Sequence, residues 1–153
     1  MAAALTDEQY RRDTGAYFKS LHRTLNHLLV ADRIWLRRLT GTGDAPARLD
    51  AVLFDDLAAL ATARQQEDGR LSAFVNGLSE AQCDELWEYR NLSGAPQRER
   101  CREILAHLFN HQTHHRGQAH VILSTLGLSE PEPLDLIIMV RERSAAAPAP
   151  RPT

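Results

Sequence analysis

The chain has 153 residues, 43% of them hydrophobic and 25% charged, which suits a single globular domain that can be stable without disulfides. A formal net charge of −2 gives no electrostatic basis for binding nucleic acid or an anionic membrane surface. Because there are only two cysteines, Cys83 and Cys101, and no apolar run of the ~20 residues that span a membrane, we expect a cytoplasmic protein with reduced thiols.

The first predicted helical region covers residues 6–39 and is interrupted near residues 13–17, where Gly15 weakens the helical pattern. After this break the sequence predicts one face of a long helix, because a stripe recurs at intervals of three and four residues. The stripe consists of Leu21, Leu25, Leu28, Asp32, Trp35 and Leu39. GTGDAP, residues 41–46, contains two glycines and a proline and ends this helix.

A second helix is predicted over residues 50–77 from its apolar spacing. Residues 78–98 are mixed in character. Ser79 and Gln82 have the spacing of a helix-capping box, and LWEYR, residues 86–90, alternates as an extended segment does.

A third long helix is predicted over residues 97–126, ended by Gly127. Residues 134–142, LDLIIMVRE, form one short apolar element, helix or strand, that is expected to pack on the rest. These elements predict an all-α, up-down helix bundle with antiparallel neighbours, in one domain over residues 1–143. Residues 144–153 read as a disordered tail rich in proline and alanine.

Five of the seven histidines lie between residues 107 and 120 of the third predicted helix. His111 and His115 fall one turn apart on its apolar face, so their rings can converge. Two such imidazoles repel each other when charged and leave ring nitrogens unpaired when neutral, and a bound divalent metal resolves both problems. The alternative is ordinary packing and hydrogen bonding in the core, and the spacing alone leaves both interpretations open.

His27 is the candidate for a third ligand, because it lies in the apolar segment LNHLLVADRIWL and can face the histidine pair across the bundle. Asp32 interrupts the apolar stripe of the same helix. It either hydrogen-bonds a ligand imidazole, or forms an ion pair with Arg33 or Arg37 or a hydrogen bond between helices.

Three other polar residues near the histidine pair have two interpretations each. Arg116 and Gln118 either bind a carboxylate or carbonyl of a substrate or connect their helix to its neighbour. His107 either hydrogen-bonds a ligand histidine or acts as a general base. A fourth protein ligand, His107 or Asp32, would instead indicate a structural metal.

Three segments together resemble the DinB family of metal-binding four-helix bundles. The segments are TLNHLLVADRIWLRRLTG (24–41), ILAHLFNHQTHHRGQAHVIL (104–123) and PLDLIIMVRE (133–142). Members of that family bind a divalent ion, zinc or nickel, through one histidine of an early helix and an HxxxH pair of a later helix. The resemblance therefore implies that His27, His111 and His115 bind Zn²⁺ or Ni²⁺.

Some relatives in that family transfer low-molecular-weight thiols such as bacillithiol, or act on mycothiol conjugates. The resemblance thus implies a metal-dependent thiol S-transferase or hydrolase with an open coordination position. Its substrate would be a small molecule, such as a low-molecular-weight thiol. The alternative is a non-catalytic metal-binding or stress-response protein with a structural metal.

One feature departs from the family. Relatives carry a further N-terminal helix before the equivalent of TDEQYRR, residues 6–12, whereas this sequence starts close to that point. Either the start of the sequence is late or the bundle lacks most of the first helix. A bundle without one wall exposes the apolar faces of its other helices. We therefore expect a homodimer, marginal stability, or an N-terminal segment that fills the gap.

Overall fold

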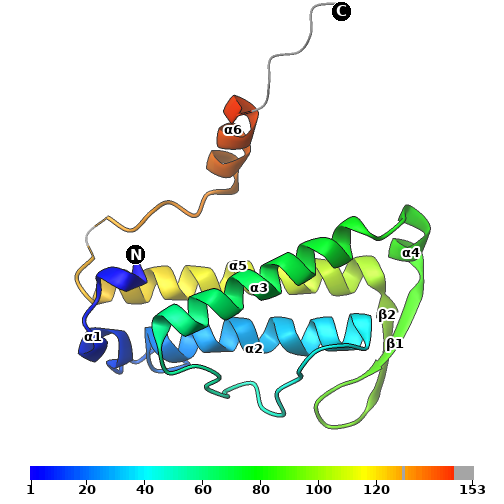
Figure 1. Ribbon diagram of the computed structural model, residues 1–153, viewed down its shortest axis with the longest axis horizontal. Coiled ribbons are helices and arrows are strands. Elements are labelled where there is room, and N and C mark those ends of the chain that lie inside the picture. Colours follow the sequence, from blue (N-terminus) through cyan, green and yellow to red (C-terminus); the bar gives the residue numbers. More distant parts are fainter. Residues whose placement is uncertain (129, 147–153) are drawn as a thin grey trace, which may run out of the picture.

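The computed structural model describes residues 1–128 and 130–146. Three long helices form its body, α2 (Leu21–Thr40), α3 (Leu57–Asn76) and α5 (Cys101–Thr125), as Figure 1 shows. The shorter elements are η1 (Ala2–Ala4), α1 (Asp7–Arg11), α4 (Glu80–Asp84), β1 (Leu86–Arg90), β2 (Pro96–Arg100) and α6 (Leu136–Ala146). The all-α prediction is confirmed, with one short β-hairpin added.

Helix α2 is the central helix, and the other two long helices pack against it. Helices α2 and α3 run in the same direction, whereas α5 runs in the opposite direction (Figure 1). The expectation that all neighbours are antiparallel is therefore wrong for α2 and α3. The reason is the connection between them, residues 41–56, which is long enough in extended form to return along the whole of a 20-residue helix.

This connection is held against α2 by Asn26, whose side chain is fully buried. Its Oδ1 accepts hydrogen bonds from the backbone N–H groups of Leu53 and Phe54, at 2.8 and 3.0 Å. Helix α3 then begins at Leu57, not near residue 50 as predicted, because the Asp56 side chain caps it by accepting from the N–H of Ala59. The N-cap fixes the start of the helix after the apolar pattern has already begun.

The break predicted around Gly15 is present and wider than expected, because α1 ends at Arg11 and α2 starts at Leu21. Ser20 caps α2 by accepting a hydrogen bond from the N–H of Arg23. The C-terminal end of α2 lies at Gly41, whose φ of 70° is the left-handed conformation that glycine adopts most easily.

The helix predicted from residue 97 starts later, because residues 96–100 pair with β1 as an antiparallel hairpin. In the register, Leu86 lies opposite Arg100 and Arg90 lies opposite Pro96. The extended reading of LWEYR is confirmed, and so is the capping box of Ser79 and Gln82 at the start of α4. The second strand has no apolar alternation, so its sequence did not distinguish it from the following helix.

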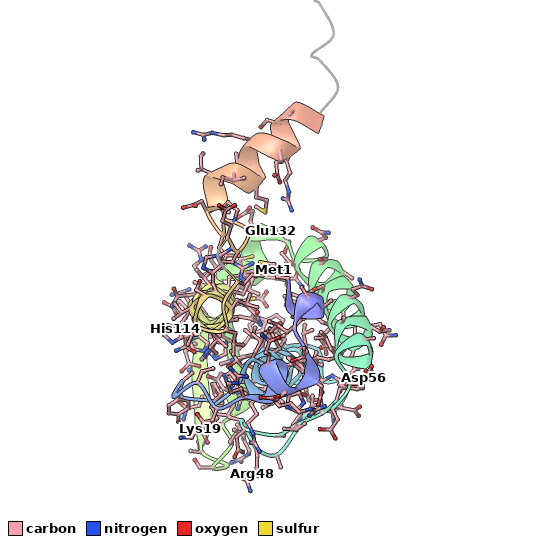
Figure 2. The ribbon with its side chains drawn as sticks, turned by 90° about the vertical axis from the view of Figure 1, so that its left-hand side faces the viewer. Met1, Lys19, Arg48, Asp56, His114 and Glu132 are labelled. Atoms are coloured by element: carbon pink, nitrogen blue, oxygen red, sulfur yellow. The ribbon has the colours of Figure 1, made fainter. Side chains whose placement is uncertain are left out.

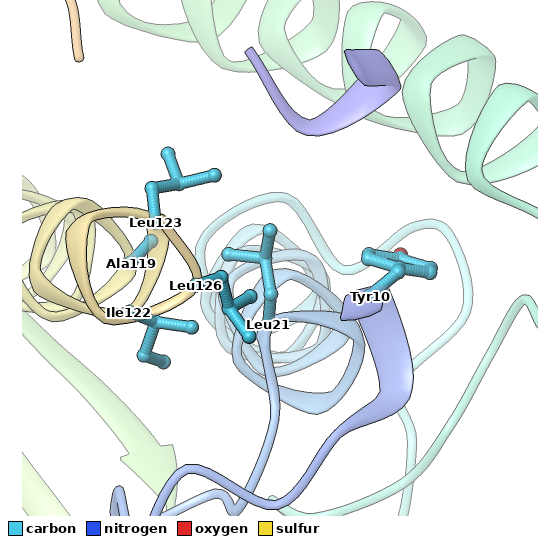
Figure 3. Close-up of a cluster of buried hydrophobic side chains, with 6 residues drawn as sticks. All are labelled: Tyr10, Leu21, Ala119, Ile122, Leu123 and Leu126. Atoms are coloured by element: carbon cyan, nitrogen blue, oxygen red, sulfur yellow. The ribbon is translucent and has the colours of Figure 1, made fainter. Parts of the chain in front are cut away.

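The core is divided among several clusters along α2. One cluster joins α1, α2 and the C-terminal half of α5 (Figure 3). Its members are Tyr10, Leu21, Ala119, Ile122, Leu123 and Leu126. Ala2 and Leu5 pack against it. The buried residues of α5 lie on its predicted apolar face and include His115, whereas His111 is half-buried.

Helix α6 stands away from the three long helices in Figure 1. The expectation that its segment packs on the rest is wrong for this chain, since Leu136 is 70% exposed and Ile137 52% exposed. The helix also includes residues 144–146, which were assigned to the disordered tail. Residues 147–153 lie outside the described part of the chain, so the tail stays a prediction there.

Both cysteines are unpaired, Cys83 half-buried and Cys101 buried. Within the described residues, no helix combines the length and the apolar character needed to cross a membrane.

Candidate metal centre

His27 of α2 and His111 and His115 of α5 lie together where these two helices pack. The Nε2 atoms of His27 and His111 are 3.2 Å apart. One ring nitrogen from each of the three histidines lies within 4.8 Å of the other two. The structure therefore brings together the three residues that the sequence singled out from two distant segments.

The orientation of His27 is set by the connection that crosses α2. Its Nδ1 lies 2.8 Å from the carbonyl oxygen of Leu49, and a carbonyl can only accept a hydrogen bond. The proton of the neutral ring is therefore on Nδ1, and the lone pair is on Nε2, which faces the other two histidines. Asn26, the preceding residue, binds the same connection at Leu53 and Phe54.

His115 is oriented in the same way by Gln118, one turn further along α5. The Nδ1 of His115 lies 2.7 Å from Oε1 of Gln118, and Nε2 of Gln118 lies 3.0 Å from Nε2 of His114. If the amide oxygen accepts from His115, the amide N–H group donates to His114, and both contacts are satisfied. The Nε2 atom of His115 then carries the lone pair, as it does in His27.

All three rings are neutral at pH 7, because their pKa values are lowered. For His111 burial lowers the pKa from 6.5 to about 4, with a further contribution from the neighbouring His115 and His27. Burial is also the main cause of the lowered pKa of His27 and of His115. Neutral imidazole is the form that ligates metals.

This donor set fits a divalent ion of the zinc or nickel type. Neutral imidazole nitrogens are borderline ligands that zinc and nickel bind well. In addition, the Nδ1 atoms of His27 and His115 are hydrogen-bonded to oxygen, the usual outer partner of a metal-ligating histidine. Core packing with a hydrogen bond accounts for the approach of His27 to His111, and the metal interpretation also accounts for the position of His115 beside both.

Phe18 covers one side of the three histidines, a feature that the sequence pattern did not indicate. Its ring stacks on that of His27, with centroids 4.0 Å apart, and meets His115 edge-on at 5.6 Å. Phe18 belongs to the irregular segment between α1 and α2, so no helical or strand periodicity marked its direction. It shields one side of the site from water.

Asp32 does not contact the three histidines through any hydrogen bond within the described residues. Its carboxylate accepts from Arg64 of α3 at 2.6 Å and from Gln112 of α5 at 2.5 Å. Asp32 is almost fully buried and joins the three long helices. Of the interpretations left open for this residue, the structure shows contacts between helices, and the ion pair is formed with Arg64 of α3 and not with Arg33 or Arg37.

His107 and Arg116 lie apart from the group of three. The ring centroid of His107 is 6.0 Å from that of His111, and its ring packs edge-on against Trp35. Arg116 is exposed and its guanidinium approaches the Thr113 hydroxyl at 3.5 Å. It lines a small apolar cavity of about 280 Å³ with Met1 and other residues away from the triad.

Comparison with known proteins agrees with this architecture. The family model described as the DinB family matches residues 1–142. A crystal structure of a DinB-like protein from Bacillus cereus ATCC 10987 is similar in fold, with a TM-score of 0.61 and 22% sequence identity. The similarity covers 83% of this chain and 81% of that one. No curated protein matches the chain significantly.

Proposed function

The chain belongs to the DinB family, and we propose that it is a metal-dependent enzyme whose Zn²⁺ or Ni²⁺ is bound by His27, His111 and His115. The observation that carries the proposal is the convergence of three ring nitrogens within 4.8 Å of one another. The proposed reaction is the transfer of a low-molecular-weight thiol, with metal-assisted hydrolysis as the second candidate.

An open coordination position is supported by the ligand count. Among residues 1–128 and 130–146, the group that can hold a metal contains the three histidines and no carboxylate or thiol. Asp32 is engaged by Arg64 and Gln112, and His107 is directed toward Trp35. Three protein ligands with one free position are typical of catalytic zinc, whereas structural zinc usually has four.

A divalent ion bound at this position supplies Lewis-acid chemistry, which holds a thiol as thiolate or makes a water nucleophilic near neutral pH. Neighbouring residues orient the histidines for metal binding. The Leu49 carbonyl and the Gln118 amide fix the tautomers of His27 and His115, so that the lone pairs point inward. Phe18 excludes water from one side, which strengthens electrostatic interactions inside the site.

Thiol transfer is favoured over hydrolysis by what surrounds the histidines. Hydrolysis needs a group beside the metal that takes the proton of the attacking water. Asp32, a buried carboxylate of α2, is held by an arginine and an amide. Among the described residues, the other bases in ring contact with the three histidines are His107 and His114. A thiolate needs no further deprotonation before it attacks an electrophile.

An activity comparison tests this proposal. Protein loaded with one equivalent of Zn²⁺ or Ni²⁺ would be assayed for conjugation of small thiols to a fluorogenic alkylating agent and for hydrolysis of an activated ester. We expect thiol conjugation in the wild type and in His120→Ala, whose histidine lies outside the triad, and none above background in His111→Ala. Equal rates in wild type and His111→Ala, with both proteins folded, would exclude the proposed reaction.

We also propose that the protein is cytoplasmic, as expected from its two unpaired thiols.

A further inference from the structure

We propose that Cys83 and Cys101 form a redox-active pair, in which a hydroperoxide oxidises Cys83 and Cys101 then closes an intramolecular disulfide. Both cysteines are unpaired in the structure. Disulfides that form in the cytosol are usually transient and redox-sensing, so a reversible pair agrees with the proposed cytoplasmic location. The pair lies apart from the metal centre and does not depend on the proposed function.

The backbone brings the two cysteines together at the base of the β-hairpin. Cys83 belongs to α4, and Cys101 is the first residue of α5. The N–H group of Cys101 donates to the Glu85 carbonyl at 3.1 Å, which extends the pairing of Leu86 with Arg100 by one position. Because Cys83 lies two residues before Glu85, this hydrogen bond brings its backbone close to that of Cys101.

Further contacts beside this hydrogen bond hold α4 against the start of α5. The guanidinium of Arg100 donates to the Asp84 carbonyl at 2.7 Å, and Arg102 forms an ion pair with the Asp84 carboxylate. Asp84 directly follows Cys83, whereas Arg100 and Arg102 flank Cys101. The residue after one cysteine is therefore bound to both neighbours of the other.

The structure around α4 allows the small adjustment that a disulfide requires. Two bridged cysteines have Cα atoms about 4.4–6.8 Å apart. Helix α4 has five residues, and none of them is buried. A small displacement of α4 toward α5 therefore breaks no contact in the hydrophobic core.

The two thiols differ in accessibility, which assigns the order of the reaction. Cys101 is 0% exposed, and burial raises the pKa of its thiol. The Cys83 thiolate raises this pKa further, an effect that requires the two sulfur atoms to lie near each other. Cys83 is only half-buried, so a dissolved oxidant reaches Cys83 first.

The reaction takes place in two steps. The Cys83 sulfur attacks one oxygen of the hydroperoxide, the O–O bond breaks, and Cys83 becomes a sulfenic acid while an alcohol leaves. The Cys101 sulfur then loses its proton and attacks the Cys83 sulfur, and the S–O bond breaks with release of water. Two thiols are thus oxidised to one disulfide, and the hydroperoxide is reduced to an alcohol and water. Exchange with a small thiol restores both cysteines.

The burial of Cys101 gives the pair a protective role. A sulfenic acid that stays accessible is oxidised further to a sulfinic acid, which small thiols do not reduce. Cys101 is shielded from the oxidant, so it remains a thiol and captures the sulfenic acid of Cys83. The disulfide therefore preserves Cys83 in a form that can be restored.

The position of the pair separates it from the three histidines. It lies at the end of the long helices opposite α1 (Figure 1), which is the far end in the view of Figure 2. Along α5, Cys101 is about 15 Å from His111, at 1.5 Å per residue. Oxidation of the cysteines and loss of the metal are therefore separate events.

Peptide mapping after oxidation tests the proposal. Native full-length protein would be treated with hydrogen peroxide, blocked with N-ethylmaleimide and digested with trypsin without reduction. Trypsin cleaves after Arg90 and Arg100, so the cysteines fall in separate peptides, residues 71–90 and 101–102. We expect these peptides to be joined in protein that migrates as a single chain on a denaturing gel, and to separate after treatment with dithiothreitol.

Two single variants assign the roles of the cysteines. Cys101→Ala keeps the buried position apolar and should leave Cys83 as a sulfenic acid that dimedone traps, or as a sulfinic acid when peroxide is in excess. Cys83→Ser should keep the Cys101 thiol free, because the oxidant does not reach it. Both variants should retain the helical circular dichroism of the wild type.

A redox titration with reduced and oxidised glutathione distinguishes a preformed pair from chance encounters of two thiols on one chain. A disulfide that fits the fold should give an effective thiol concentration at least about tenfold higher in the folded protein than in urea. An effective concentration that is no higher in the folded protein would overturn the proposal. Wild-type protein in which Cys83 carries dimedone while Cys101 stays free, or in which disulfides form only between chains, would overturn it as well.

Discussion

The Nε2 atoms of His27 and His111 lie 3.2 Å apart, although 84 positions separate the two residues in the sequence. Because His27 uses its only proton on the Leu49 carbonyl, its Nε2 can only accept. Without a metal, His111 must therefore donate its Nε2 proton to His27. For both Nε2 atoms to ligate a divalent ion, the single proton of the neutral His111 ring would have to lie on Nδ1 instead of Nε2.

The lowered pKa of His111 predicts how the stability of the metal-free protein depends on pH. Its pKa is 6.5 in an unfolded chain and about 4 in the folded one, so between these values the unfolded chain binds more protons. We expect the free energy of unfolding to fall as the pH is lowered from 6.5 to about 4, and to level off below that.

Urea unfolding of chelator-treated protein at several pH values measures this effect. His111→Gln is the matched control, because it keeps a polar side chain that does not titrate. Its stability should fall less between these pH values than that of the wild type. Parallel curves for the two proteins would mean that His111 does not have a lowered pKa in the folded chain.

Gln118 should affect metal affinity although it does not bind the metal. Gln118→Leu removes the acceptor of the His115 Nδ1 proton, and the loss of such an outer hydrogen bond typically weakens metal binding about 10–100-fold. Gln118→Glu retains an acceptor and should bind zinc at least as tightly as the wild type. Competition with a chromogenic zinc chelator measures each affinity, and equal affinities for all three proteins would contradict this role.

Asp32 should determine stability rather than metal content. Asp32→Ala removes the buried partner of Arg64, which keeps its exposed pair with Asp68, and also removes the acceptor of the Gln112 amide. We expect it to lower the free energy of unfolding by about 1–3 kcal/mol. The exposed pair of Asp50 and Arg48 provides the control, and Asp50→Ala should lower it by about 1 kcal/mol or less.

The Asp32→Ala and Asp50→Ala variants should both retain the metal stoichiometry of the wild type. An Asp32→Ala protein of normal stability that has lost its metal would show that Asp32 acts on the metal centre after all.

The site was more predictable than the topology. The helical spacing of His111 and His115 placed them on one buried face, and the apolar surroundings of His27 indicated that it faces the same core. These inferences depend on local periodicity, which can be recognised from the sequence alone. The Leu49 carbonyl was not predictable, because a backbone group leaves no residue-type signal.

The parallel arrangement of α2 and α3 was missed for a related reason. In the sequence, residues 41–46 predict the end of one helix and residues from 50 onward predict the next. The hydrogen bonds of the Asn26 side chain, which hold the chain as it returns along α2, cannot be recognised from the sequence. The role of Arg64 could not be predicted either, because the sequence does not indicate which acidic residue an arginine on an apolar helix face pairs with. Long-range pairs such as Asp32 and Arg64 depend on this topology.

Helix α6 makes the expected homodimer a specific proposal. The helix and the segment just before it expose Leu134, Leu136, Ile137, Met139 and Val140, each between 39% and 70% exposed. At roughly 80 Å² for each side chain this is about 400 Å² of apolar surface. If α6 of each copy packs on the body of the other, each partner buries roughly 800 Å², the area of a stable interface.

Light scattering coupled to size-exclusion chromatography tests this proposal. We expect a dimer for the wild type and a monomer for Leu136→Glu/Ile137→Glu. The control Arg141→Glu/Arg143→Glu changes charge on the same helix without reducing its apolar surface, and should remain dimeric. A monomeric wild type at micromolar concentration would rule out the dimer.

The most direct test of the central claim is the metal content of untagged protein, measured by elemental mass spectrometry beside the triple variant His27→Ala/His111→Ala/His115→Ala. We predict about one zinc or nickel ion per chain in the wild type, as a three-histidine site binds one ion. The triple variant should contain none while keeping its helical circular dichroism. A wild type without stoichiometric metal, or a variant that retains it, would contradict the assignment of these histidines as metal ligands.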